Sequence, residues 1–115
     1  MKLGEVCLLT ADVRRLAAFY RRLMDIPETC DDPVHQTVFA GEPSLTIYCD
    51  GQPHCAERSP VALAFTVKDI DAAYQKLLSM NARIVQPPMK QPWGAVNLIF
   101  LDPDDNRVYL RQFPA

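Results

Sequence analysis

The side chains that could do chemistry are few and widely spaced in this 115-residue sequence. Glu5 lies in a short apolar stretch near the N-terminus, two residues before Cys7. A carboxylate that is partly desolvated at the edge of a pocket becomes a stronger base, so Glu5 is the candidate general base. Glu5 could also pair with a cationic group of a ligand. A solvated carboxylate at the end of a strand is the alternative interpretation.

Aromatic and polar side chains at five further positions suit the binding of a small molecule. Trp93 offers a flat apolar face beside a proline-rich stretch, and Tyr48 and Tyr109 offer rings that carry hydroxyl groups. Asn97 and Arg111 add polar contacts if their strands turn them towards the ligand. Simple packing of Trp93 and solvent exposure of Arg111 are the alternatives. The candidate ligand-binding residues are Glu5, Cys7, Tyr48, Trp93, Asn97, Tyr109 and Arg111.

Other catalytic or metal-binding patterns are weak. The only histidines are His35 and His54, and no Ser/His/Asp order or glycine-rich phosphate loop is visible. The stretch from Cys49 to Cys55 contains one His but lacks C-x-x-C spacing. We therefore expect neither histidine catalysis nor a zinc site.

The elements that must position these residues repeat along the chain. An apolar stretch runs to Asp12, and a second one runs to Asp69; each Asp is suited to cap the N-terminus of a helix. Helical spacing of apolar residues follows in both places, and the shift of 57 residues that carries Asp12 onto Asp69 superimposes the two sets. The sets are Val13, Leu16, Ala17 and Tyr20, and Ile70, Ala73, Tyr74 and Leu77. This pattern indicates duplication.

Three strand signals follow each predicted helix, so each half reads β-α-β-β-β. The signals are residues 26–29, 34–40 and 45–49 in the first half, and 83–86, 95–101 and 108–113 in the second. The prediction is one domain, 1–115, of class α+β, with module 1 at about 1–58 and module 2 at about 59–115.

Connecting segments are marked by turn residues. Residues 50–60 contain Gly and two Pro and predict a linker between the modules. Pro87, Pro88 and Pro92 predict a stiff, extended loop before Trp93. Residues 102–106 predict the turn between the last two strands.

Alternation within the first strand of each half indicates a sheet with one covered face. In the stretch 61–67, the large apolar residues alternate with Ala62, Ala64 and Thr66. The large set should pack under the helix, and the small set should leave room on the other face. Such an open face suits a small-molecule cup.

Three stretches resemble the motifs of the glyoxalase/bleomycin-resistance/dioxygenase (vicinal oxygen chelate) superfamily. They are the strand-Asp-helix segment with Phe19-Tyr20, the segment 65–73, and Trp93-Gly94 followed by 100–106. The resemblance implies two βαβββ modules whose mixed sheets curl around a cup-shaped cavity with the helices outside, and it implies a homodimer.

The family usually has glycine at the end of each helix and in the last turn. Asp25, Asn81 and Asp105 occupy those positions here. Asn and Asp tolerate positive φ best among the non-glycine residues, so we expect positive φ at all three.

Metal-dependent members of the family place four ligands on strands that face the cup. The matching positions hold Glu5, Ala62, Tyr109 and either Thr46 or Tyr48. Ala has no donor atom, and Thr and Tyr are poor ligands for the divalent ions involved. We therefore expect no metal and no other cofactor.

Composition excludes some partners. Hydrophobic residues make up 49% of the chain, and the formal net charge is -2. Arg14, Arg15, Arg21 and Arg22 cluster on the first predicted helix, and we interpret them as a solvated helix face rather than a nucleic-acid surface. No apolar run approaches the ~18 residues of a membrane span. We expect a cytoplasmic protein with no nucleic-acid or membrane partner.

Three functions remain open. The favoured hypothesis is a non-catalytic protein that binds or sequesters a small molecule, aromatic or cationic, as in the bleomycin-resistance branch. The second is an enzyme: a lyase or isomerase using Glu5 as base, or a glyoxalase-like or dioxygenase-type metal enzyme whose ligands lie elsewhere. The third is a structural or regulatory dimer with a filled cup.

Overall fold

The computed structural model describes residues 1–55 and 59–114. It divides into two compact units, Met1–His54 and Cys55–Ala115. Residues 56–58 of the expected linker lie outside the described residues. No helix in the described part of the chain is long and apolar enough to cross a membrane.

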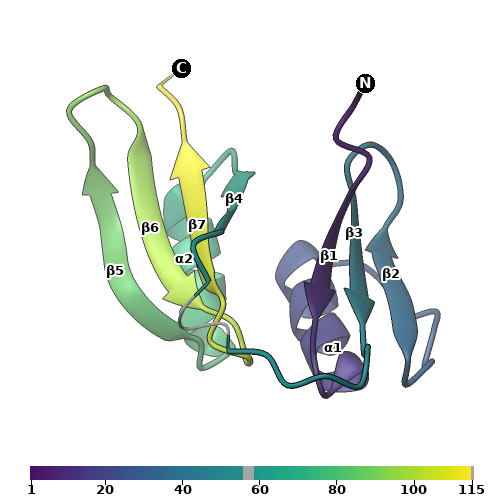
Figure 1. The fold of residues 1–115 in the computed structure, drawn as a ribbon. Helices are drawn as coiled ribbons and strands as arrows, with labels where there is room; N and C mark the ends of the chain where they lie inside the picture. Colours follow the sequence, from purple (N-terminus) through teal and green to yellow (C-terminus); the bar gives the residue numbers. More distant parts are fainter. Residues whose placement is uncertain (56–58, 115) are drawn as a thin grey trace. The chain divides into compact units, whose positions relative to one another are not determined.

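The first unit contains three strands and one helix. They are β1 (Glu5–Leu9), α1 (Val13–Met24), β2 (His35–Phe39) and β3 (Ser44–Tyr48). The sheet order is β1-β3-β2, with β1 parallel and β2 antiparallel to β3. Helix α1 packs against β2 and β3 (Figure 1).

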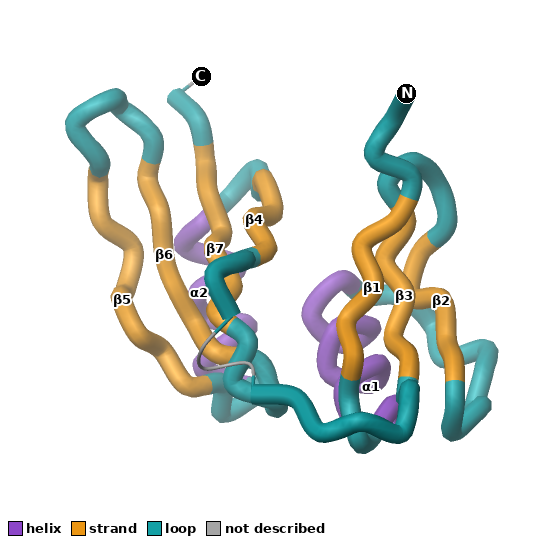
Figure 2. The backbone as a smooth tube through the Cα atoms, in the orientation of Figure 1, coloured by secondary structure: helices purple, strands orange, loops and turns teal. Residues whose placement is uncertain are grey.

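The second unit contains four strands and one helix. They are β4 (Leu63–Thr66), α2 (Ile70–Ser79), β5 (Arg83–Lys90), β6 (Val96–Leu101) and β7 (Arg107–Gln112). The sheet order is β4-β7-β6-β5, and β4 is the strand that pairs in parallel with β7 (Figure 2). Helix α2 packs against β5, β6 and β7. The α+β class with two mixed sheets is confirmed.

The strand expected at residues 26–29 is wrong, so the first module is βαββ rather than βαβββ. The N–H of Ile26 donates to the carbonyl of Arg21 at 2.9 Å and closes the end of α1. Pro27 has no N–H to give to a neighbouring strand. These two residues therefore leave no run of free donors from which a strand ladder could form.

The loop expected at Pro87 and Pro88 is instead part of β5. Among the strands that the structure describes, β5 lies at the edge of its sheet and has β6 as its one neighbour. Proline is tolerated on an edge strand because the missing donor would face away from the sheet. The pairing shifts register between Gln86 and Met89, which accommodates the two prolines.

Both helices begin where the sequence predicts. Asp12 Oδ1 accepts the N–H of Arg15 at 3.1 Å, and Asp69 Oδ1 accepts the N–H of Ala72 at 3.0 Å. These side chains satisfy donors of the first helical turn that have no partner within the helix. The 57-residue shift therefore also relates the structural starts of α1 and α2.

The expected helical faces are buried, more completely in α1 than in α2. Val13, Leu16, Ala17 and Tyr20 are all buried. In α2, Ile70 and Leu77 are buried, whereas Ala73 and Tyr74 are half-buried.

Positive φ occurs at the three predicted non-glycine positions, with φ of 55° at Asp25, 56° at Asn81 and 68° at Asp105. Asp105 lies in the predicted turn between β6 and β7. The buried carboxylate of Asp102 organises this turn, because it accepts the N–H groups of Asp104 and Asn106 at 2.9 and 3.0 Å.

Replacement of Asn81 should report the cost of its left-handed backbone. Asn81→Ala should lower the free energy of unfolding by about 1 kcal/mol, since a Cβ-bearing residue without a short polar side chain tolerates this conformation poorly. Asn81→Gly should be at least as stable as the parent. Urea denaturation of the three proteins measures the order, and an alanine variant as stable as the parent would contradict it.

Candidate small-molecule binding site

The first sheet has an open face on the side away from α1. Residues of β1 alternate in exposure: Glu5, Cys7 and Leu9 are exposed, and Val6 and Leu8 between them are half-buried. Because successive side chains point to opposite faces of a strand, the exposed set lies on the open face.

Glu5 is engaged on this face by its neighbour on β3. Its Oε1 atom accepts a short hydrogen bond from the hydroxyl of Thr46, which is only 4% exposed. The Glu5 carboxylate therefore supplies the hydrogen-bond acceptor for a buried threonine hydroxyl.

Strand register decides which β3 residue corresponds to Tyr109. In the first unit, Cys7 lies opposite Thr46; in the second unit, Ala64 lies opposite Tyr109. The 57-residue shift carries Cys7 onto Ala64, so Thr46 and Tyr109 are equivalent. Of the two candidates left by the sequence, Thr46 occupies this position and Tyr48 lies two residues further along.

Both histidines have local partners. His35 lies opposite Tyr48 in the β2–β3 pairing, and their ring centroids are 6.2 Å apart in an edge-to-face arrangement. His54 Nε2 lies 2.9 Å from Asp50 Oδ2. The pKa of Asp50 lies below its ordinary value, because the N–H of Gln52 donates to the carboxylate and His54 adds a second contact.

The second sheet also has an open face, and β7 contributes its charged and aromatic side chains. Val108 and Leu110 are buried on the α2 side. Arg107, Tyr109 and Arg111 alternate with them and therefore share the opposite face.

The strands on both sides of β7 contribute smaller or less polar neighbours. Ala64 on β4 lies opposite Tyr109. On β6, Leu101, Ile99 and Asn97 lie opposite Arg107, Tyr109 and Arg111, respectively. The open face is therefore an arginine-tyrosine-arginine stripe between rows of mainly small or apolar side chains.

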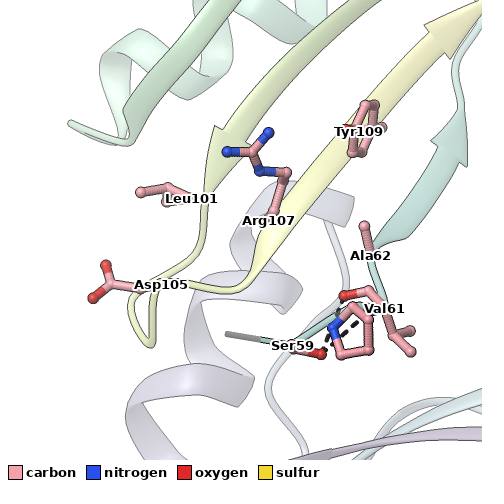
Figure 3. A pocket seen from close by; sticks show the side chains of 8 residues that line it. Ser59, Val61, Ala62, Leu101, Asp105, Arg107 and Tyr109 are labelled. Atoms are coloured by element: carbon pink, nitrogen blue, oxygen red, sulfur yellow. Dashed lines mark hydrogen bonds between the residues drawn. The ribbon is translucent and has the colours of Figure 1, made fainter. Parts of the chain in front are cut away.

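A pocket of about 360 Å³ opens on this face of the second unit. Figure 3 shows Tyr109 and Arg107 on β7, with Ala62 across from them in the residue just before β4. The remaining lining residues are Ser59, Pro60, Val61, Leu101 and Asp105. By the resemblance described above, Ala62 and Tyr109 occupy the two positions of this module at which metal-dependent members of the family carry metal ligands.

The charges around the pocket are unbalanced. Asp105 forms an ion pair with Arg83, which also donates to the carbonyl of Asp102 at 2.9 Å. Arg107 is exposed and forms no ion pair or hydrogen bond with any residue that the structure describes. The pocket therefore has a guanidinium group whose charge is not neutralised.

The four positions that carry metal ligands in metal-dependent members of the family hold poor metal ligands in this chain. Glu5 supplies the one carboxylate, Thr46 donates its hydroxyl to that carboxylate, Ala62 has no donor, and Tyr109 offers a phenol. Divalent ions in such sites take carboxylate, imidazole or thiolate ligands. The residues at these positions do not fit a metal ion of that kind.

The arginines of α1 do not form one solvated face, so that expectation is wrong for Arg21. This side chain is only 4% exposed; its guanidinium donates to the Gln36 side chain and, at 3.1 Å, to the carbonyl of Thr37 on β2. Arg14 pairs with Asp31 at 2.9 Å. These contacts tie α1 to the segment that precedes and forms β2.

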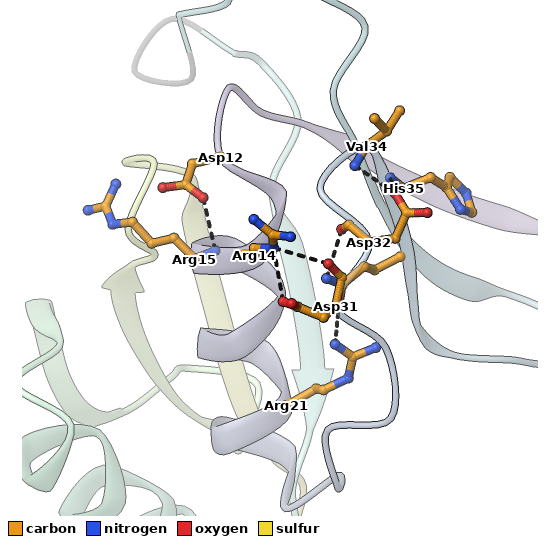
Figure 4. A network of polar contacts seen from close by, with 9 residues as sticks. Asp12, Arg14, Arg15, Arg21, Asp31, Asp32, Val34 and His35 are labelled. Carbon is orange, nitrogen blue, oxygen red and sulfur yellow. Dashed lines mark hydrogen bonds and ion pairs between the residues drawn. The ribbon is translucent and has the colours of Figure 1, made fainter.

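The same segment is fixed by Asp32. Its Oδ1 atom accepts the N–H groups of Val34 and His35 at 2.8 and 3.1 Å, and these bonds hold the pKa of the Asp32 carboxyl below its ordinary value. The polar network in Figure 4 thus joins α1 to the segment before and within β2, and the burial of Arg21 keeps its guanidinium away from a ligand in solvent.

The structure distributes the seven predicted binding residues over three places. Glu5, Cys7 and Tyr48 share the open face of the first sheet. Asn97, Tyr109 and Arg111 share that of the second.

Trp93 follows β5 in a turn and is 68% exposed. Among the seven, only Tyr109 lines the pocket. Arg107 was missed, although its spacing of two residues from Tyr109 and four from Arg111 places it on the same strand face.

Comparison with known proteins supports the fold and the family. The family model described as the Glyoxalase/Bleomycin resistance protein/Dioxygenase superfamily matches residues 2–110. None of the curated proteins matches this sequence.

Solved structures share the fold at low sequence identity. A glyoxalase/bleomycin resistance protein/dioxygenase family enzyme from Burkholderia phytofirmans PsJN is similar with a TM-score of 0.84 and 15% identity, over 99% of this chain and 100% of that one. A glyoxalase-related enzyme from Fulvimarina pelagi is similar with a TM-score of 0.81 and 16% identity, over 99% and 89%.

A lactoylglutathione lyase from Agrobacterium tumefaciens is similar with a TM-score of 0.73 and 15% identity, over 95% of this chain and 91% of that one. The family match covers nearly the whole chain, and the folds agree along the same length. This chain belongs to the glyoxalase/bleomycin resistance protein/dioxygenase superfamily.

Proposed function

We propose that this chain is a metal-independent small-molecule-binding protein, similar in role to the bleomycin-resistance branch, and that its ligand is an aromatic or apolar acid. The observation that carries the proposal is the guanidinium of Arg107, which pairs with none of the described residues, in a pocket that Ala62 and Tyr109 also line. By the family resemblance, Ala62 and Tyr109 occupy positions at which a metal-dependent relative would carry anionic or neutral metal ligands.

The size and lining of the pocket suit a small ligand. Its volume of about 360 Å³ lies within the range of ligand sites, which is roughly 300–1,000 Å³. Pro60, Val61, Ala62 and Leu101 give it apolar walls. Tyr109 adds a ring against which a flat group can stack.

The charge of the pocket selects the polar group of the ligand. A guanidinium group repels a divalent cation and attracts an anion, and its planar donors match a carboxylate in a bidentate arrangement. The pocket's carboxylate, Asp105, is already paired with Arg83. The sequence alone suggested an aromatic or cationic ligand; the pocket favours an aromatic anion.

Removal of the Arg107 charge should weaken the binding of such an acid. A biphenyl with a carboxylate at one end is a suitable probe, and calorimetric titration measures its affinity. Arg107→Gln should reduce the affinity about 10- to 100-fold, which corresponds to the loss of one charge-assisted hydrogen-bonded contact.

A matched control is available on α1. Arg22 is exposed and lies in the other unit, so Arg22→Gln removes the same charge without touching the pocket. It should leave the affinity unchanged. Equal losses in both variants, or no binding to the parent protein, would refute the proposed site.

Metal independence has a separate test. Addition of Mn²⁺, Fe²⁺, Ni²⁺ or Zn²⁺ to the purified protein should give no stoichiometric binding and no rise in Tm, since a specific ligand would stabilise the folded state. One tightly bound ion per chain that is lost in Glu5→Gln would instead make a metal-dependent lyase or dioxygenase the leading function.

A further inference from the structure

We propose that Arg111 forms a second anion-binding subsite on the open face of the second sheet, so that the ligand carries two acidic groups joined by an apolar body. The inference rests on the proposed function, in which Arg107 binds the first acid. The second subsite narrows the class of ligand for this face from a monoacid to a diacid.

The two arginines are spaced along one strand. Arg107 and Arg111 lie four residues apart on β7 and point to the same face, with Tyr109 between them. At a rise of about 3.3 Å per residue, their Cα atoms are roughly 13 Å apart. The strand therefore presents two cations to one extended molecule rather than to a single small anion.

The guanidinium of Arg111 is held in place by its neighbours. Its Nε atom donates to the hydroxyl of Thr66 on β4 at 3.0 Å, and its Cζ atom lies 5.0 Å from the ring centroid of Phe113. Both contacts leave the terminal nitrogens available. An arginine that is oriented before binding loses less side-chain entropy when it binds a carboxylate.

The surroundings of Arg111 do not neutralise it. Its contacts within the described residues are a hydroxyl and a ring, and neither carries a negative charge. Opposite it on β6, Asn97 has a side-chain oxygen that is shielded from solvent and has no hydrogen-bond partner among the described residues. Arg111 therefore has donors left for an acid, whereas the Asn97 oxygen is an acceptor and contributes nothing to anion binding.

The surface between the arginines is suited to an apolar body. Tyr109 is flanked by Ala64 on one side and by Ile99 on the other. A rigid, flat molecule with a carboxylate at each end would contact this ring and the two aliphatic neighbours while both acids meet arginines.

A matched pair of biphenyl acids tests the second subsite. The dicarboxylate, with one acid at each end, should bind the parent protein about tenfold more tightly than the monocarboxylate, which corresponds to one further charge-assisted contact. The two equivalent ends of the symmetric acid account for only about twofold. Arg111→Gln should reduce the preference from about tenfold to this statistical twofold and leave the affinity for the monocarboxylate unchanged.

Two further variants separate a subsite from a general effect of charge. Thr66→Val removes the hydroxyl that orients Arg111 and should reduce the preference for the dicarboxylate without abolishing it. Arg22→Gln removes a positive charge that lies in the other unit and does not line the pocket, and it should preserve the preference.

The outcomes distinguish the two proposals. If both acids bind equally to the parent protein, or if the preference survives in Arg111→Gln, the second subsite is wrong while the Arg107 site stands. If neither acid binds the parent protein, the proposed function fails, and the second subsite fails with it.

Discussion

A strand turns successive side chains to opposite faces of its sheet, and one helix covers only one of those faces. In each unit, the residues under the helix form the core, as Leu45 and Ile47 do on β3 and Val108 and Leu110 do on β7. The residues between them are consequently committed to the open face, whatever their chemistry. The ends of the helices are fixed by Asp12 and Asp69, so the placement of each helix follows from local hydrogen bonds. The composition of the open faces is therefore where this fold can change its function without loss of its core.

Sequence patterns predicted those parts of the fold whose causes are local. The caps and the helical faces depend on a few neighbouring residues and were found from spacing and residue type. The three positive-φ positions were found from the family resemblance, which places glycine there, together with the tolerance of Asn and Asp for that backbone conformation. The strand at 26–29 failed because Ile26 gives its N–H to Arg21 and Pro27 has none. The burial of Arg21 could not be read from the helix, since its partners Gln36 and Thr37 lie on β2. Neither the strand-like composition of residues 26–29 nor the position of Arg21 on its helix shows which acceptor an N–H group will bond.

The site was predicted only in part, and for a physical reason. Tyr109 was found because it occupies a position defined by a motif, and it does line the pocket. Arg107 was missed because a lone arginine at the start of a strand is usually solvated, and only the absence of a paired carboxylate in the described residues sets it apart. The choice between Thr46 and Tyr48 required the register of two parallel strand pairs, which single-sequence patterns do not supply.

Charge is the property that most clearly separates this open face from one built around a metal ion. A metal site needs several donors that lower the energy of a cation, whereas β7 presents two arginines with Tyr109 between them. The hydroxyl of Thr66 and the ring of Phe113 orient one of these cations without cancelling its charge. At roughly 13 Å on an exposed face, the repulsion between the two guanidinium groups is largely screened by water and salt, so both charges are tolerated without a partner. Under the proposal, a ligand that brings two negative charges and an apolar body would pair with both cations and bury the Tyr109 ring at the same time, and this double gain favours an extended acid over either a metal ion or a cation.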